Sequence, residues 1–373
     1  MNQLNDLFSS FSPAGKDAWA KAANTEIEGK NAFEHLLWER AGVTGLPYYD
    51  AADQPDKTFN LPLSNNEFLG ARSWYNMPLV KVLAEEEANK KALHHLTSGA
   101  DGIIFDLGQN NDVSLQKLLT EIEWPICQVA FLVDQHAEFF FSTLEKYLLE
   151  KKFEPASIGG FVLLKTYPHY PQSLHKVVHK LSPYKNFKLI GITSSHTNRI
   201  EFLSDLLLKA VTEVEVLTDA GVPEVTALHQ VFFFVPIGQD FFLELATLKV
   251  LRMLWYQVMN AYGVKNYSAA DVPIHVIHPV WNHEAFQPHE NMLAATTAGL
   301  SAILGGCTSL SLEPAAPEER LERIALNVST ILREESHLNK VADPTAGSYY
   351  LESIIKNLAD AAWTRFTNQL KEG

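Results

Sequence analysis

The chain has 373 residues and a mass of 41.8 kDa, enough for one large domain or for one domain with an extension. Its formal net charge of −14 argues against a protein that wraps nucleic acid, because such proteins need clustered lysine and arginine side chains. No apolar run reaches about 18 residues, and the N-terminus lacks the basic start and apolar core of a signal peptide. We therefore expect a cytoplasmic protein without a membrane span.

Residues 1–60 differ from the rest of the chain and predict an N-terminal arm. A polar helical pattern at 15–30 precedes a turn-rich segment that ends near residue 60. The aromatic residues of the arm are Trp19, Phe33, Trp38, Tyr48 and Tyr49. These are too many for a solvated tail, so we expect the arm to wrap either the main domain at 61–373 or a partner protein.

After the arm, apolar strand patterns alternate with amphipathic helical patterns. Most of the strand patterns are apolar on both faces, as in a parallel sheet that helices cover. The eight candidate strands are Phe68–Trp74, Gly102–Leu107, Ile126–Val133, Ser157–Leu164, Phe187–Thr193, Gln230–Pro236, Ile274–Val280 and Cys307–Leu312. Eight strands alternating with helices match a (β/α)8 barrel, although a doubly wound open sheet gives a similar pattern. The pattern alone leaves both folds open.

The helical patterns are clearest at 201–220 and 241–261, and a last helix at 353–369 would close a ring. The segment 272–314 shows a complete β–α–β unit. Its first strand leads into a loop that contains Trp281, and then into a helix that begins near Glu290. Gly305-Gly306 ends that helix before the next strand. Such a unit is typical of a parallel sheet with helices outside it.

Short motifs of nucleotide and zinc sites are missing, since the sequence contains no GxxxxGK[ST], no GxGxxG after a strand, no HExxH and no paired CxxC. His275 and His278 are three residues apart on one candidate strand, so they point to opposite faces and cannot both ligate one ion. We predict no metal site. Cys127 and Cys307 both lie in apolar strand-like runs and are expected to be reduced core residues.

Two features are candidates for a cleft on position alone. His196 follows the strand pattern at 187–193, where a histidine can act as a general acid or simply cap the next helix. The segment Tyr167–Tyr184 is predicted to be a long loop rich in histidine, tyrosine and proline. In a barrel, the loops that follow the strands hold the chemistry, so this loop is a candidate part of the cleft.

Three ordered blocks in the second half of the chain carry a family resemblance. The first block, IHVIHPVW at 274–281 with NMLAATTAGLSAILGGCTSLSLEP at 291–314, resembles THSQTSGW with NNxxRxxxEAxAAxxGGxQSLHTN of the methylmalonyl-CoA mutase family. The second block, GQDFFLELATLKVLRMLW at 238–255, resembles the family's GxNFFxEVAKLRAARMLW. The third block, NVSTILREESHLNKVADPTAGSYYLE at 327–352, resembles the family's NTQxILQEESGIxxVxDPxGGSYYxE. The resemblance implies a (β/α)8 barrel that binds a CoA ester along its axis. It also implies a separate C-terminal domain that brings adenosylcobalamin to the barrel mouth.

Several residues that the family's catalytic chains use for the substrate differ here. The family's TMYxxRPWTIRQY segment corresponds to GARSWYNMPLVKV at 70–82, which keeps Arg72 and Trp74 but lacks the TMY element and the second arginine. The family's SGYH becomes TSSH at 193–196, which keeps His196 and places Ser195 where the family has tyrosine. The glutamine two residues after the strand histidine becomes Ile277, which cannot hydrogen-bond a substrate or a cofactor.

These departures resemble the small, β-type subunit of the family. The resemblance implies a non-catalytic barrel that supports a large subunit, which binds adenosylcobalamin and interconverts methylmalonyl-CoA and succinyl-CoA. The DxHxxG motif of the cobalamin domain is absent from the sequence, so we expect no cofactor on this chain. The substrate-cleft candidates are Arg72, Trp74, Ser195, His196, Ile277 and Trp281, with His196 as a degenerate catalytic candidate.

Other functions stay open. The chain could be an active acyl-CoA mutase barrel whose cobalamin domain is a separate polypeptide, but the missing TMY element and Ile277 argue against this. It could instead be a stand-alone barrel that binds a small ligand through the loop at 167–184. Whether acyl-CoA still enters the barrel of a small subunit is also left open.

Overall fold

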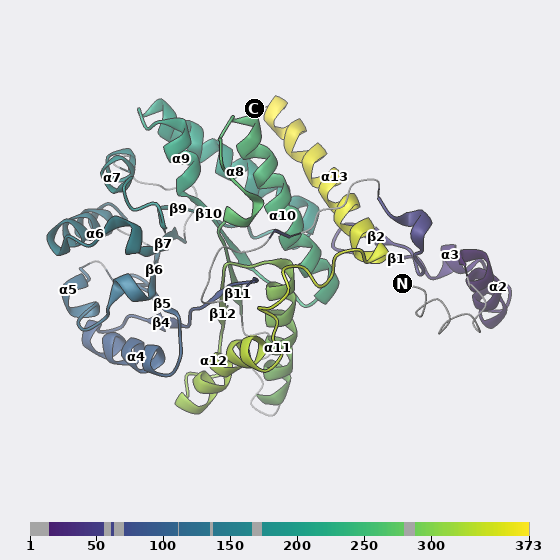
Figure 1. Ribbon diagram of the computed structural model, residues 1–373, viewed down its shortest axis with the longest axis horizontal. Helices are drawn as coiled ribbons and strands as arrows, with labels where there is room; N and C mark the ends of the chain where they lie inside the picture. The colour runs from purple at the N-terminus through teal and green to yellow at the C-terminus, as the bar shows by residue number, and fades with distance from the viewer. Residues whose placement is uncertain are drawn as a thin grey trace, which may run out of the picture.

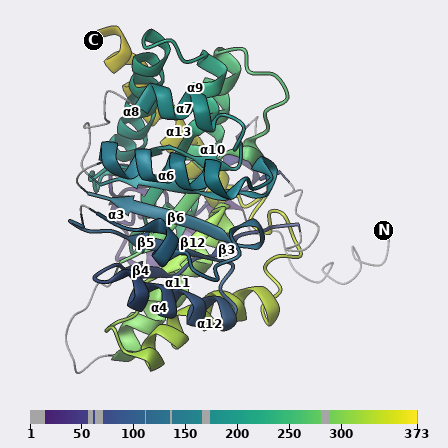
Figure 2. The same cartoon turned by 90° about the vertical axis from the view of Figure 1, so that its left-hand side faces the viewer.

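The computed structural model describes residues 15–55, 61–62, 71–110, 112–134, 137–165, 174–279 and 288–372. Strands and helices alternate from residue 75 onward, with the strands inside and the helices around them (Figures 1 and 2). The strands are β3 (Tyr75–Asn76), β4 (Leu79–Lys81), β5 (Gly102–Asp106), β6 (Gln128–Val133), β7 (Gly159–Leu164), β8 (Phe187–Lys188), β9 (Ile190–Ile192), β10 (Val231–Pro236), β11 (Ile274–His278) and β12 (Ser309–Leu312).

These strand segments form a closed ring of parallel strands. One sheet has the order β3-β12-β11-β10-β9 and the other has the order β4-β5-β6-β7-β8. β3 and β4 are two pieces of one strand, because Met77 N donates to Leu310 O (2.9 Å) and Pro78 O accepts from Ile104 N (3.0 Å). β8 and β9 likewise join around Leu189, so the two sheets meet at both edges. Ten described segments minus the two breaks give eight strands, and the predicted (β/α)8 barrel is confirmed.

The helices of the barrel are α4 (Glu85–Thr97), α5 (Leu115–Leu118), α6 (Ala137–Lys151), α7 (Leu174–Leu181), α8 (Arg199–Asp219), α9 (Glu224–Gln230), α10 (Phe241–Ala261), α11 (Pro288–Gly305), α12 (Glu319–Glu334) and α13 (Tyr349–Glu372). Short 3-10 turns precede three strands, at η2 (Trp124–Ile126), η3 (Pro155–Ser157) and η4 (Ala269–Asp271). Among the described residues, no helix is both long enough and apolar enough to cross a membrane.

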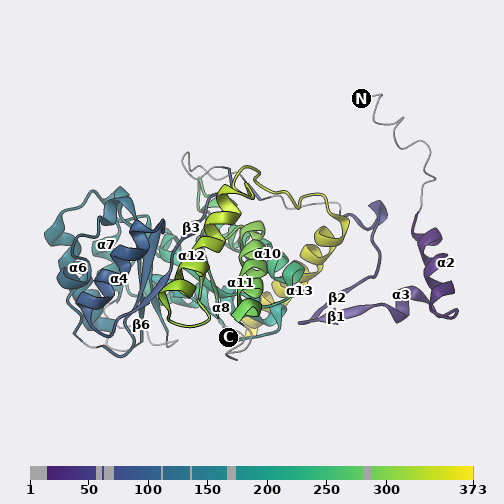
Figure 3. The same ribbon diagram turned by 90° about the horizontal axis from the view of Figure 1, so that it is seen from below.

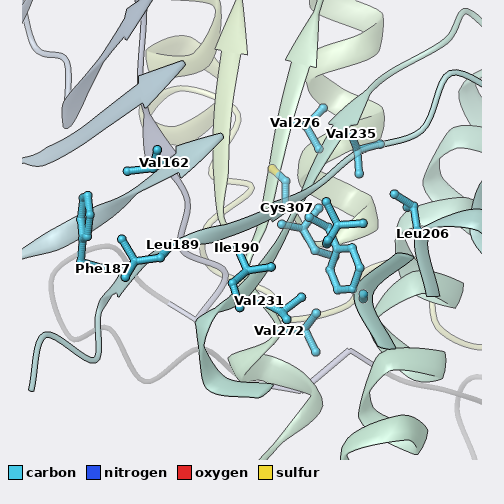
Figure 4. Close-up of a cluster of buried hydrophobic side chains, with 14 of the residues drawn as sticks. Val162, Phe187, Leu189, Ile190, Leu206, Val231, Val235, Val272, Val276 and Cys307 are labelled. Carbon is cyan, nitrogen blue, oxygen red and sulfur yellow. The ribbon is translucent and has the colours of Figure 1, made fainter. Parts of the chain in front are cut away.

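The core has two parts because most strands are apolar on both faces. The outer part lies between the strands and the helices, and Figure 4 shows some of its residues, with Val162, Ile190 and Val231 on the strands and Leu206 on α8. The inner part fills the ring itself. The free cysteines Cys127 and Cys307 are half-buried and buried, respectively.

The first strand was predicted in the wrong place. Residues 63–70 lie outside the described residues, residues 71–74 are not in a strand, and the strand pieces lie between 75 and 81. Asn76 and Pro78 resemble a turn in the sequence, yet both fit. The Asn76 side chain donates to Leu326 O (3.0 Å), and Pro78 lies where the strand exchanges one neighbour for the other.

The predicted long loop at 167–184 is also wrong in its second half. Residues 166–173 lie outside the described residues, but 174–181 form α7. Its buried side chains, Leu174, Val177, Val178 and Leu181, follow the spacing of one helix face. The histidines and lysines between them lie on its other faces, which explains why the segment looked polar.

The arm has a part that contacts the barrel and a part that projects from it. It comprises α2 (Lys16–Glu26), α3 (Ala32–His35), a hairpin of β1 (Trp38–Arg40) and β2 (Val43–Gly45), and η1 (Ala51–Asp53). β2 and η1 contact α13, whereas α2 has no buried residue. α2 and α3 extend away from the barrel on the right of Figures 1 and 3.

Candidate functional site

The carboxyl-terminal end of the barrel, called the mouth here, carries a pocket of about 330 Å³ beside β9 and β10. The mouth pocket is lined by Arg40, Ala41, Ser194, Ser195, His196, Thr197, Arg199, Pro236, Gly238, Gln239, Asp240, Leu243 and Glu244. The hairpin of the arm forms one wall, because Ala41 O accepts from Arg199 N (3.0 Å) and Arg40 pairs with Asp240 (3.0 Å). The arm is therefore fastened to the mouth.

A buried ion pair forms the floor of the mouth pocket. Arg199 Nε and Nη2 both donate to Glu244 Oε1, at 2.8 and 2.6 Å. The side chains are 8% and 5% exposed, and Glu244 Oε2 has no hydrogen-bond partner. Burial raises the pKa of the Glu244 carboxyl although Arg199 acts in the opposite direction. The pair joins the start of α8 to the first turn of α10.

The two polar candidates at the mouth are exposed. Ser195 and His196 lie in the loop after β9, and the His196 side chain is 47% exposed. His196 Nδ1 is 3.5 Å from Glu201 Oε2 in the first turn of α8, so the ring lies beside this helix. Both residues line the mouth pocket, but neither touches the interior cluster described next.

The axis of the barrel is filled by aromatic rings. The centroid of Phe161 is 4.4 Å from that of Phe232, 5.1 Å from that of His275 and 6.4 Å from that of Phe234. All four side chains are between 1% and 8% exposed. We call this set the axial plug. Ile277, two residues after His275, packs into the same interior cluster and is 9% exposed.

His275 is held in the axial plug as a neutral ring. Its Nδ1 lies 2.8 Å from Ser309 Oγ, and its Nε2 lies 3.3 Å from Ser311 Oγ. Burial lowers the pKa of His275 to about 3, because the charged imidazolium would lose its hydration. With both nitrogens facing hydroxyl groups, His275 acts as a structural residue.

The remaining candidates lie elsewhere. Arg72 and Trp74 precede the first strand at the amino-terminal end of the barrel, called the base here, opposite His196. Trp74 Nε1 donates to Ser329 Oγ (2.9 Å) in the outer core. Arg72 is 7% exposed, and burial lowers its pKa. Trp281 lies outside the described residues. The structure thus brings Ser195 and His196 together, but not with Arg72 and Trp74.

Comparison with known proteins identifies the family. The model of the methylmalonyl-CoA mutase family matches residues 186–373, which is half of the chain. The chain belongs to the methylmalonyl-CoA mutase family. A methylmalonyl-CoA mutase small subunit of Porphyromonas gingivalis is 27% identical over 394 residues, covering 96% of this chain and 63% of that protein. The chain therefore spans less than two thirds of that relative.

Further matches differ in extent. A probable methylmalonyl-CoA mutase small subunit of Mycobacterium bovis is 34% identical over 176 residues, covering 44% of this chain and 28% of that protein. A dihydropteroate synthase of Xanthomonas albilineans has a TM-score of 0.41 at 12% identity, covering 76% of this chain and 99% of that chain. Because this likeness is so loose, the barrel fold is assigned from the strand pairing alone. The sequence matches support both membership of this isomerase family and the resemblance to its small subunits.

The cofactor that the family resemblance implies, adenosylcobalamin, does not fit the described residues of the mouth. His196 lies beside Glu201, and His278 at the end of β11 is only 1% exposed. We therefore derive no chemical step through this cofactor on this chain.

The axial plug and the Arg199–Glu244 pair were not found from the sequence. Phe161 and Leu163, like Phe232 and Phe234, are two residues apart, which is the spacing of one strand face. This signal was present, but strands apolar on both faces do not reveal which face turns inward. The ion pair joins residues 45 positions apart on two helices, and no local pattern marks it.

Proposed function

We propose that this chain is the small, non-catalytic subunit of a cobalamin-dependent methylmalonyl-CoA mutase, and that it supports a large catalytic subunit. The observation that carries the proposal is the axial plug. A CoA ester threaded along the axis would need the space that Phe161, Phe232, Phe234 and His275 occupy. Moving four packed rings aside would cost far more than a flexible chain regains by binding, since interiors are close-packed.

The side chains that replace the family's polar residues support the same proposal. Ile277 places an apolar side chain in the interior cluster, where it offers a substrate carboxylate no hydrogen bond. Ser195 and His196 are in the loop above, with His196 beside Glu201. The chemistry of the complex, in which methylmalonyl-CoA and succinyl-CoA are interconverted, is accordingly assigned to the large subunit together with the adenosylcobalamin.

The arm supports a role in pairing. We assign residues 1–60 to an arm and 61–373 to the barrel. Trp19 stacks on Tyr48 (5.2 Å, 18°) and packs against Phe33 (5.2 Å), yet α2 buries no residue against the barrel. An amphipathic helix gains most of its stability from packing, and the described residues of this chain bury no residue of α2, so we infer that α2 packs on a partner. The large subunit would be that partner.

Co-expression with a large mutase subunit tests the proposal. We expect a 1:1 pair to co-purify, with mutase activity lost when the cobalamin site of the large subunit is destroyed. Trp19→Ala should weaken pairing, because it removes the centre of the aromatic cluster of the arm. Phe139→Ala is the matched control, since Phe139 is an exposed aromatic (48%) on α6 of the barrel.

Two outcomes would contradict the proposal. Recovery of the two chains only as separate species would exclude the subunit role. Turnover by this chain mixed with an isolated cobalamin domain would instead support an active barrel chain. The second outcome would also require the axial plug to open.

A further inference from the structure

A second pocket lies at the base of the barrel, where the strands begin. It has a volume of about 130 Å³ and is separate from the mouth pocket. Tyr75, Met77, Gln128, Gly160, Phe161, Asn186, Lys188, Phe232, Pro273, His275, Thr308 and Ser309 line this base pocket. Phe161, Phe232 and His275 of the axial plug form its inner end, so it is a blind pocket. Its role is independent of the proposed subunit function.

The base pocket contains one cationic side chain, Lys188. The side chain is half-buried, and its Nζ donates to Lys185 O (2.7 Å) and His229 O (2.8 Å). An ammonium group has three N–H donors, so one remains for a ligand. Within the described part of the chain, Lys188 forms no ion pair with a carboxylate, and Asp271 acts on it only from farther away. Its charge therefore has no close counter-ion.

Two polar side chains of the pocket, His275 and Thr308, are already hydrogen-bonded within the barrel. The two ring nitrogens of His275 face serine hydroxyls. Thr308 Oγ1 accepts a hydrogen bond from Ile274 N and donates one to Ile274 O. Burial lowers the pKa of Lys188 to about 8, so the ammonium is still largely protonated at pH 7. An anion placed beside it would restore the electrostatic stabilisation that burial removed.

The walls restrict what kind of anion fits. Met77, Phe161, Phe232 and Pro273 are apolar, and Lys188 is the single lysine or arginine of the lining, so a second negative charge on the ligand would have no cationic partner. The ligand should therefore carry one charge on an apolar body. A cavity of about 150 Å³ takes up benzene, so this slightly smaller pocket suits about six heavy atoms.

We propose that the base pocket binds a short monocarboxylate of about four carbons. Its carboxylate accepts a hydrogen bond from Lys188 Nζ, and its alkyl chain lies against Phe161 and Phe232. The ligand reaches the pocket from the base, where Asn186 is exposed at the rim. Gly160 lines the pocket on the β7 side, next to Phe161.

Saturation-transfer NMR titration of the full chain with butyrate at pH 7 tests this proposal. Butanamide has the same size and no charge, and we expect it to bind at least about tenfold more weakly, because it cannot form the charge-assisted hydrogen bond. Lys188→Met should weaken butyrate binding by a similar factor. Lys185→Met removes a neighbouring exposed charge without changing the pocket lining, and should alter the affinity by less than about twofold.

Equal binding of butyrate and butanamide, no binding of either, or unchanged affinity in Lys188→Met would each overturn the proposal. If circular dichroism shows that Lys188→Met does not fold, Asn186→Trp replaces it, because this exposed rim position can block the entrance and leave Lys188 intact. Butyrate binding that survives Asn186→Trp would place the ligand elsewhere and refute the site.

Discussion

Removing one ring from the axial plug should destabilise the whole barrel. Phe161 is 6% exposed and contacts three other rings, with centroids 4.4 to 6.4 Å away. Truncating a buried phenylalanine to alanine costs about 3–5 kcal/mol, through lost burial and the cavity left behind. Aromatic pairing adds about 0.5–1.5 kcal/mol to what burial alone predicts. We therefore expect Phe161→Ala to lower the free energy of unfolding by about 4 kcal/mol.

Urea unfolding followed by circular dichroism measures this change. The midpoint should fall while the slope with denaturant stays constant, because the mutation changes stability and not the surface exposed on unfolding. Phe139→Ala is the matched control at an exposed position and should change the free energy by less than about 0.5 kcal/mol. A loss below about 1 kcal/mol for Phe161→Ala would refute the reasoning, since it would mean that the interior of the ring is not packed.

Three further predictions concern other buried positions. Glu244→Gln leaves the Arg199 guanidinium buried without a carboxylate, and should lower the free energy of unfolding by about 3 kcal/mol in the same urea assay. Gly160→Ala should cost about 4 kcal/mol or prevent folding, because a Cβ would overlap Val129 O on β6 and the φ of +138° disfavours alanine. His275→Gln should flatten the loss of stability between pH 6.5 and pH 4, because the wild-type unfolded chain takes up a proton there that buried His275, with its pKa near 3, does not.

Matched variants make these results interpretable. Lys146→Ala removes an exposed ion pair to Glu150 and should cost less than about 1 kcal/mol. Gly263→Ala also has a positive φ, +71°, but a Cβ there would meet no atom within 4 Å, so it should cost only about 1–2 kcal/mol. A pH slope unchanged by His275→Gln, or equal losses at Gly160 and Gly263, would contradict the packing described for the barrel.

The architecture could be predicted because its signals are periodic. The helix predicted at 241–261 coincides with α10, and the βα alternation gave the right number of strands. The first strand was missed because Asn76 and Pro78 weaken its pattern. Both residues fit because the strand changes its neighbour at Pro78, and that change occurs because the ring of strands closes there. No local pattern contains that information.

The candidate site could be predicted only in part. His196 and Ser195 do line a pocket at the mouth, as expected for residues that follow a barrel strand. The position of Lys188 could not be predicted, because a single lysine in an apolar run is usually exposed. Its position in the base pocket follows from the alternation of β8, in which Phe187 faces the outer core and its neighbour faces the interior. Only the closed ring brings Lys188 together with Phe161 and Phe232.

The most direct test is the number of acyl-CoA molecules that the purified pair of subunits binds. Isothermal titration of the co-purified 1:1 complex with succinyl-CoA should give one site per pair, located on the large subunit, because the axial plug closes the barrel of this chain. Phe161→Ala in this chain should leave that number unchanged if the complex still forms. Two equivalent sites per pair in the wild-type complex would contradict the closed barrel and the supporting role assigned to it.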